Sequence, residues 1–61
     1  MKRGDLIRTI EKSGAVFIRN GSNHDWYKNM KTGIAEAVPR HREIKEHLAK
    51  KIIKRLAFAE N

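Results

Sequence analysis

Two apolar stripes at helical spacing, one near each end of the chain, restrict the fold more than any other feature of the sequence. In residues 2–13 the stripe ends before Gly14, a residue type common just after a helix, and in residues 42–58 a longer stripe repeats every fourth position. Neither predicted helix can bury its stripe alone, so both need a shared apolar surface. The stripes consist of Leu6, Ile7 and Ile10 in the first segment, and of Ile44, Leu48, Ala49, Ile52, Ile53 and Leu56 in the second.

Three short β-rich segments between these helices can provide that surface. Residues 15–20 and 24–29 are separated by a hairpin signal at Asn20-Gly21, two residues that tolerate positive φ. A third segment, residues 34–38, ends at Pro39, which lacks the N–H that a strand ladder uses. The order α-β-β-β-α predicts an α+β fold with a three-stranded antiparallel sheet and both helices on one face. This is the arrangement of a double-stranded RNA-binding domain, and it leaves the second face of the sheet open.

Alternation of side chains along a strand predicts which residues share a face of the sheet. In the second strand, His24, Trp26 and Lys28 would point to one face, opposite to Asp25 and Tyr27. Trp26 is the single tryptophan of the chain, and the alternation leaves two places for it, the core or a base-stacking site. In the first strand, one face would carry Val16 and Ile18 and the other Phe17 and Arg19.

Charge narrows the class of partner. The chain has 61 residues, enough for one domain over residues 1–61, and 14 Lys+Arg oppose 7 Asp+Glu to give a net charge of +7. So strong a positive field favours nucleic acid, an anionic membrane or an acidic protein as partner. No apolar run reaches the ~20 residues of a membrane span, and no signal peptide is recognisable, so we expect a cytoplasmic protein without membrane association. The absence of cysteine excludes disulfides, thiolate metal sites and a cysteine nucleophile.

Three segments, taken in order and spacing, resemble the HicA family of toxins, small ribonucleases of bacterial and archaeal toxin–antitoxin pairs. The resemblance covers nearly the whole chain, from Lys2 to Phe58. Many relatives carry two adjacent histidines where this chain has Asn23 and His24, and Gly-Thr-Leu where it has Glu46-His47-Leu48. The matching segments are the N-terminal helix ending at Gly14, then Gly21-Ser22-Asn23-His24, then Val38-Pro39-Arg40-His41 leading into Glu43-Ile44.

The resemblance implies both an activity and a partner. The activity is that of a type II toxin, an endoribonuclease that cleaves mRNA without a metal or other cofactor and so inhibits translation. The implied fold is again that of a double-stranded RNA-binding domain, and the implied catalytic residue is His24. The implied partner is a HicB-type antitoxin that covers the site, and we expect no direct DNA binding by the toxin alone.

The chemistry of RNA cleavage agrees with a histidine in this role. One group must take the proton of the 2′-OH and another must protonate the leaving 5′-oxygen, and an unperturbed histidine pKa of about 6.5 suits either task. We therefore expect His24, just past the turn, to act as general acid or base. The second group stays open between His41, Tyr27 and no side chain at all, with cations holding the developing charge. The acidic residues are scattered along the chain, which does not favour metal-assisted cleavage.

Several side chains are candidates for binding substrate phosphates. Lys28 lies about 13 Å along the strand from His24 at ~3.3 Å per residue, which suits a neighbouring phosphate rather than the reacting one. Arg40, His41 and Arg42 precede the second predicted helix, where cations and backbone N–H groups can meet a phosphate. His47 is expected on the surface of that helix. The predicted phosphate-binding residues are Ser22, Lys28, Arg40, His41 and Arg42.

Two other functions fit the same fold and charge. One is a non-catalytic double-stranded RNA-binding module, in which His24 only touches the RNA backbone. The other is a purely protein-binding domain whose basic face meets an acidic partner. The basic run on the second predicted helix is open to three interpretations: a solvated helix face, additional phosphate contacts, or a contact with an acidic patch on the antitoxin. That run consists of Lys50, Lys51, Lys54 and Arg55.

Overall fold

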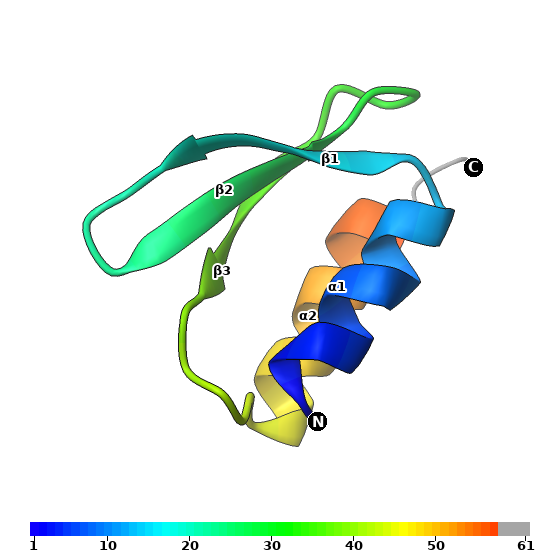
Figure 1. Cartoon of the computed structure of the whole chain (residues 1–61). Coiled ribbons are helices and arrows are strands. Elements are labelled where there is room, and N and C mark those ends of the chain that lie inside the picture. Colours follow the sequence, from blue (N-terminus) through cyan, green and yellow to red (C-terminus); the bar gives the residue numbers. More distant parts are fainter. Residues whose placement is uncertain (58–61) are drawn as a thin grey trace.

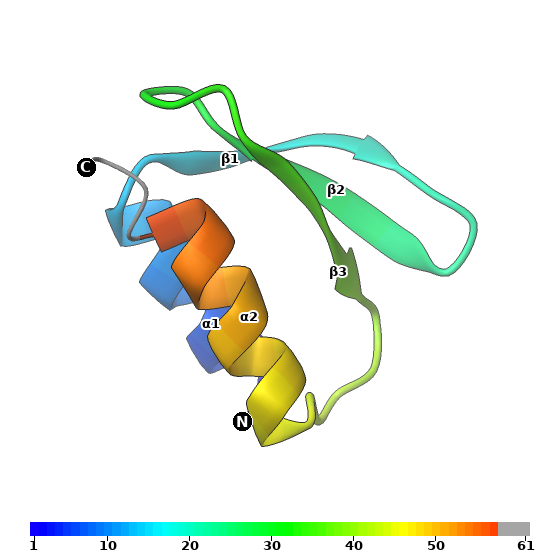
Figure 2. The ribbon, with the colours of Figure 1, turned by 180° about the vertical axis from the view of Figure 1, so that it is seen from behind.

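The computed structural model describes residues 1–57 and confirms the expected order of elements (Figure 1). The elements are α1 (Arg3–Lys12), β1 (Ala15–Asn20), β2 (His24–Asn29), β3 (Ala35–Pro39) and α2 (Glu46–Ala57). The strands form one antiparallel sheet in the order β1-β2-β3. Both helices lie against one face of the sheet and leave the other face uncovered (Figures 1 and 2). The fold is therefore the α+β arrangement of a double-stranded RNA-binding domain. Neither helix in residues 1–57 is long and apolar enough to cross a membrane.

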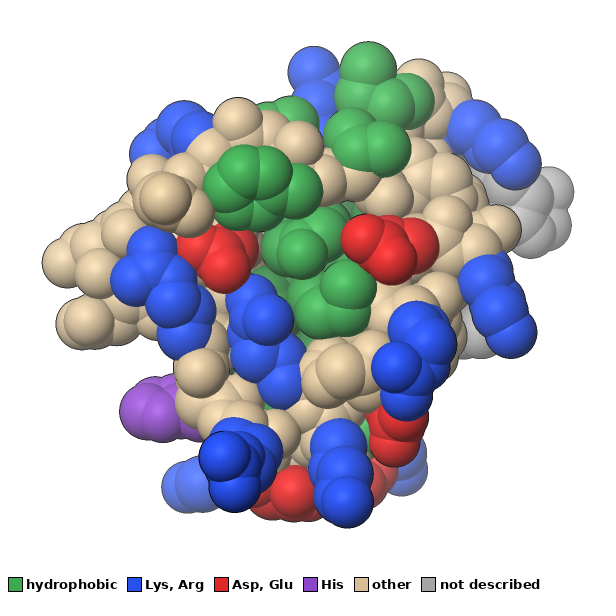
Figure 3. Space-filling view, viewed as in Figure 1, with side chains coloured by type: hydrophobic (Ala, Val, Ile, Leu, Met, Phe, Trp, Pro, Cys, Tyr) green, Lys and Arg blue, Asp and Glu red, His purple; other side chains and the backbone are tan. Residues whose placement is uncertain are grey.

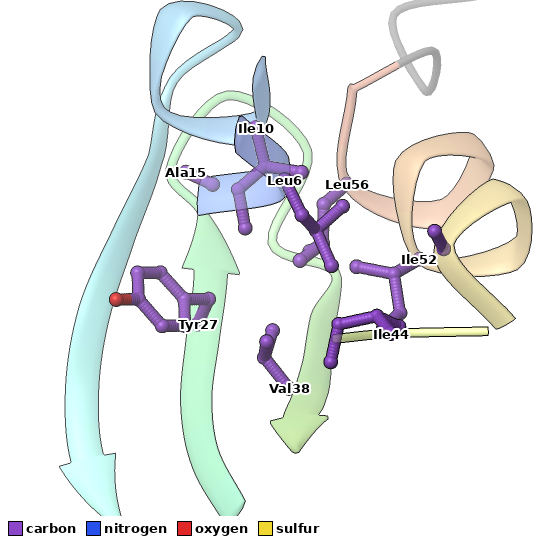
Figure 4. Packing of buried hydrophobic residues seen from close by; sticks show 9 residues of the cluster. Leu6, Ile10, Ala15, Tyr27, Val38, Ile44, Ile52 and Leu56 are labelled. Carbon is purple, nitrogen blue, oxygen red and sulfur yellow. The ribbon is translucent and has the colours of Figure 1, made fainter. Parts of the chain in front are cut away.

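The core lies where the two helical stripes meet the covered face of the sheet (Figure 4). Burying one leucine, isoleucine or valine side chain stabilises a fold by roughly 1.5–3 kcal/mol. Strand β2 shows the expected alternation, because Tyr27 and Asn29 are buried while His24 is exposed. The largest fully buried side chains are Leu6 and Ile10 of α1, Ile52 and Leu56 of α2, Val38 of β3, and Ile44.

Helix α2 begins at Glu46, four residues later than predicted. The segment before it is extended and runs beside the N-terminus, where Lys2 and Glu43 form an antiparallel bridge. The Ile44 N–H donates to the Met1 carbonyl at 2.7 Å, and the Arg42 carbonyl accepts from the Arg3 N–H at 2.9 Å. These backbone groups are already paired, so the helix cannot begin at residue 42. The predicted end of this helix at residue 58 lies outside the described residues.

The connection between β1 and β2 is longer than the predicted two-residue turn. Asn20 and Gly21 do not adopt positive φ; among the described residues only Gly14 (φ 103°) and Gly33 (φ 80°) do. The Gly21 N–H donates to the His24 carbonyl at 2.6 Å, which closes a loop over residues 21–23, the β1–β2 loop. The prediction for Gly14 is confirmed, because it follows the end of α1 with a left-handed φ.

A β-bulge at Ile18 places Arg19 on the opposite face from the one predicted. Phe17 pairs with Tyr27 and Arg19 pairs with Trp26, and the register shifts between these pairs. The extra residue reverses the alternation, so Arg19 shares the open face with Trp26 and not the covered face with Phe17. The predicted pairing of Phe17 and Arg19 on one face is therefore wrong.

Candidate active site

His24 is the first residue of β2, and its side chain is exposed on the open face of the sheet. It pairs across the sheet with Pro39, the last residue of β3, so the chain that leaves β3 passes beside it. The preceding β1–β2 loop and the following Arg40-His41 thus converge on this histidine from two sides. Within residues 1–57, neither helix covers this face of the sheet (Figures 1 and 2).

Asn23, His24, Arg40 and His41 line one open hollow of about 460 Å³, which we call the His24 hollow. Its size lies within the range of small-ligand sites in proteins. The structure thus brings together three of the predicted residues, two histidines and one arginine. Tyr27 lies on the covered face with 7% of its surface exposed, so it cannot reach the hollow. Of the two side chains predicted as second proton-transfer group, only His41 lies with His24.

A shielded carboxylate fixes the backbone on which His24 stands. Arg3 Nη2 donates to Asp25 Oδ2 at 2.9 Å, and Arg40 Nε donates to Asp25 Oδ1 at 3.0 Å. Arg3 Nε also donates to the Pro39 carbonyl at 2.7 Å. The Asp25 side chain is only 17% exposed, so both ion pairs are partly shielded from water. This Asp25 network (Arg3, Asp25, Arg40) joins α1, the start of β2 and the end of β3.

Arg40 also holds the β1–β2 loop directly. Its Nη2 donates to the Gly21 carbonyl at 2.9 Å and to the His24 carbonyl at 3.3 Å. Part of its donor capacity therefore serves the protein, while the cation still lines the His24 hollow. The guanidinium positions the backbone of His24 and contributes positive charge to the hollow.

Sequence reasoning missed Arg3 and the role of Asp25 in this arrangement. The alternation predicted that Asp25 points away from His24, and the structure confirms it. A carboxylate on the covered face needs a cationic or N–H partner, because an unpaired buried charge is costly. The sequence therefore indicates that Asp25 has a cationic or N–H partner, but it does not specify which of the many lysine and arginine side chains that partner is.

Three of the predicted phosphate-binding residues lie outside the His24 hollow. Ser22 is exposed in the β1–β2 loop, and Lys28 is half-buried on the open face of the sheet. Arg42 lines a neighbouring hollow and lies four residues before the start of α2, so it does not form the predicted phosphate site at that helix N-terminus. His47 is exposed on α2, as expected.

Trp26 lies on the open face of the sheet and is not part of the core. Its side chain is half-buried, and the Arg19 Cζ lies 5.3 Å from the centroid of its ring, within the range of a cation–π contact. A Cβ built on Gly21 would lie 3.1 Å from the indole Nε1, so the β1–β2 loop packs closely against the edge of the indole. Of the two places that the alternation leaves for the tryptophan, the structure excludes the core, because the helices cover the other face.

The electrostatic setting of the fold is basic. In the view of Figure 3, lysine and arginine side chains surround a central apolar area that is bordered by acidic groups. In the core, burial raises the pKa of the Tyr27 phenol above its ordinary value of 10.0, with the Arg3 charge partly opposing this effect. Within residues 1–57, no three His, Asp or Glu side chains lie close enough together to hold a metal ion.

Comparison with known proteins gives one family. The model of the family described as the HicA toxin of bacterial toxin–antitoxin systems matches residues 3–57, which include every helix and strand and the His24 hollow. No curated protein and no solved structure gives a significant match.

Proposed function

Because the chain belongs to the HicA toxin family and so is the toxin of a toxin–antitoxin system, we propose that it acts as an mRNA-cleaving endoribonuclease. The observation that carries this proposal is the His24 hollow, where an exposed histidine lies beside a second histidine and an arginine. The proposed partner is a HicB-type antitoxin that covers the hollow, and the proposed place of action is the cytoplasm, where mRNA is found.

The proposed reaction is an internal transfer at phosphorus. Neutral His24 takes the proton of the 2′-OH, and the 2′-oxygen bonds to the adjacent phosphorus as the bond from phosphorus to the 5′-oxygen breaks. His41, in its protonated form, donates its proton to the leaving 5′-oxygen. The products are a 2′,3′-cyclic phosphate and a 5′-hydroxyl, so no metal is required as a co-reactant. Proton transfer by such a residue typically contributes about 10²–10⁴-fold to the rate.

Positive charge supports this chemistry at the transition state. The phosphorus acquires additional negative charge on its equatorial oxygens, and Arg40 lies at the edge of the same hollow. We propose that Lys28 and Ser22 bind phosphates next to the reacting one, since both flank His24 along the chain. The proposed substrate-binding residues are therefore Ser22, Lys28, Arg40, His41 and, at the neighbouring hollow, Arg42.

The experiment that tests the proposal compares two histidine variants on a long transcript in EDTA. The wild-type protein is expected to cleave the transcript, and His24→Ala is expected to cleave about 10²–10⁴-fold more slowly while still binding it. The matched control is His47→Ala, an exposed histidine on α2, which should cleave like the wild type.

Each remaining outcome assigns the protein to one of the other functions. RNA binding without cleavage by any of the three proteins would identify a double-stranded RNA-binding module and overturn the nuclease proposal. Failure to bind RNA at all would point to a basic protein-binding domain. Cleavage that requires an added divalent metal ion would contradict the proposed chemistry.

A further inference from the structure

On the open face of the sheet, the one tryptophan lies next to small side chains of β3. Trp26 pairs with Ala37 of β3, and the next residue on the same face of β2, Lys28, pairs with Ala35. On the β3 side the indole therefore lies beside alanines, whose side chains reach little beyond the backbone. On the same strand, His24 is two residues away, about 7 Å at ~3.3 Å per residue.

Within the described residues 1–57, the cation over this ring is not paired with an acidic side chain. Arg19 lies across from Trp26 on β1, with its Cζ 5.3 Å from the ring centroid. Within residues 1–57, no carboxylate lies within ion-pairing distance of its guanidinium. Its N–H donors are thus available to a phosphate, and exposed cation–π contacts are weak enough for the guanidinium to move off the ring.

From this arrangement we infer that Trp26 forms a base-stacking subsite for one unpaired nucleotide next to the phosphate cleaved at His24. The base takes the place of the guanidinium over the indole, and Arg19 turns to the backbone phosphate of that nucleotide. Stacking on an aromatic ring is the common way in which proteins hold unpaired RNA bases, and it tolerates any base. The inference rests on the proposed nuclease function and adds the class of RNA that the site accepts.

A duplex cannot use this subsite. In a double helix both faces of each base are already covered by neighbouring bases, so no face is free to lie on the indole. The subsite therefore selects unpaired segments of RNA, although the fold is that of a double-stranded RNA-binding domain. Recognition of a duplex by shape across its minor groove would leave the indole without contact.

Trp26 also supports the β1–β2 loop, so its contribution to RNA binding has to be separated from its contribution to folding. A Cβ built on Gly21 would lie 3.1 Å from the indole Nε1, so the loop that precedes His24 packs against the ring and loss of the ring would loosen it. A test that leaves the ring in place avoids this problem. The chain has one tryptophan, so its fluorescence reports on Trp26 alone.

The test titrates His24→Ala, which is expected to bind RNA and to cleave it only slowly, with three oligonucleotides of equal length at low salt. These are an unstructured single strand, the same sequence as a duplex, and an abasic ribose-phosphate strand. The single strand is expected to quench the indole emission, and the other two are expected to bind through charge with little change in emission. Equal quenching by the duplex or by the abasic strand would overturn the inference, as would binding of the single strand without quenching.

Variants of the ring give a second, independent readout. Trp26→Phe keeps an aromatic surface and should bind the single strand with little loss, whereas Trp26→Leu should bind it about 5- to 150-fold more weakly, from the stacking energy of a base. Met30→Ala changes an exposed apolar side chain in the turn after β2 and is the matched control, expected to bind like the parent. Equal affinities for Trp26→Phe and Trp26→Leu, both folded by circular dichroism, would contradict a stacking role.

The subsite and the nuclease can fail separately. Cleavage by the wild type without quenching of Trp26 would refute the base-stacking subsite and support the nuclease function. Quenching by the single strand without cleavage would support base stacking on Trp26 and refute the nuclease function.

Discussion

His24 depends for its position on Asp25, its neighbour in the chain, whose side chain points to the other face of the sheet. Asp25 accepts hydrogen bonds from Arg3 and Arg40, and Arg40 in turn holds the His24 carbonyl. The carboxylate therefore controls the histidine through the backbone and not by touching the imidazole. It is a positioning residue, and its effect on cleavage should follow its effect on the order of the loop.

The variant Asp25→Asn tests this dependence. It keeps the size of the side chain but leaves two partly shielded guanidinium groups without a counter-charge, so the free energy of unfolding should fall by about 1–3 kcal/mol. Urea denaturation measures the change. Asp5→Asn is the matched control, since Asp5 pairs with Arg8 on the exposed surface of α1, where such a pair contributes at most ~1 kcal/mol. Equal losses in the two variants would contradict the proposed role of Asp25.

Tyr27 makes the stability of the fold sensitive to high pH. Burial raises the pKa of its phenol above the ordinary 10.0, so the unfolded chain releases this proton at a lower pH than the folded protein does. The stabilising contribution is complete below pH 10 and is lost as the pH rises through the folded-state pKa. Thermal melts of wild type and Tyr27→Phe between neutral and strongly alkaline pH should therefore show a steeper alkaline loss for the wild type. Parallel curves would rule out this explanation.

At the scale of helices and strands, local patterns predicted most of the fold and failed where distant residues intervene. The β-branched and aromatic runs gave β1 and β2 with their observed bounds, and β3 to within one residue. The start of α2 was misplaced because residues 42–44 pair with residues 1–3, which no local pattern contains. The residue types of β1 do not indicate the bulge at Ile18, so strict alternation assigns Arg19 to the wrong face of the sheet.

The candidate site was predictable only in part for the same reason. His24, Arg40 and His41 follow from the order of strands, because β2 begins where β3 ends. Whether Trp26 is buried depends on which face of the sheet the helices cover. Hydrophobic periodicity predicts two amphipathic helices, but it does not predict which face of β2 they pack against.

Substitution of alanine for glycine is expected to have opposite effects in the β1–β2 loop and in α1. A Cβ on Gly21 would meet the His24 carbonyl and the indole Nε1, each at 3.1 Å, so Gly21→Ala should disturb the β1–β2 loop and lower both stability and cleavage. Gly4→Ala in α1 meets only Arg8 Nη1 at 3.8 Å and should stabilise the protein by about 0.5–1 kcal/mol with cleavage unchanged. Chemical denaturation and cleavage rates of both variants check this pair, and an equally harmless Gly21→Ala would contradict the packing described.

For the molecule as a whole, the net charge is high for a domain of this length. A chain of 61 residues buries only about 60% of the surface of its unfolded form, so the fold has little stability in reserve and a net charge of +7 adds self-repulsion. An RNA that binds this surface releases its counterions and relieves that repulsion. Affinity for RNA should therefore fall steeply as salt is added.

Two lysine reversals show which face the RNA occupies. Lys28→Glu on the open face and Lys51→Glu on the outer side of α2 change the net charge by the same amount. If Lys28 binds a phosphate, its loss should reduce the slope of log affinity against log salt by about 0.7 for single-stranded RNA. The Lys51 variant should keep the wild-type slope. The opposite ranking, measured by fluorescence anisotropy across a salt series, would place the RNA on the helical face.

If the imidazole of His24 transfers a proton during cleavage, its removal must slow the chemical step itself, which the single-turnover rate constant in EDTA measures. With RNA held at saturation for both proteins, we expect His24→Ala to cleave about 10²–10⁴-fold more slowly than wild type while its affinity for uncleaved RNA is unchanged. A rate constant for His24→Ala equal to that of the wild type would show that His24 does not transfer the proton.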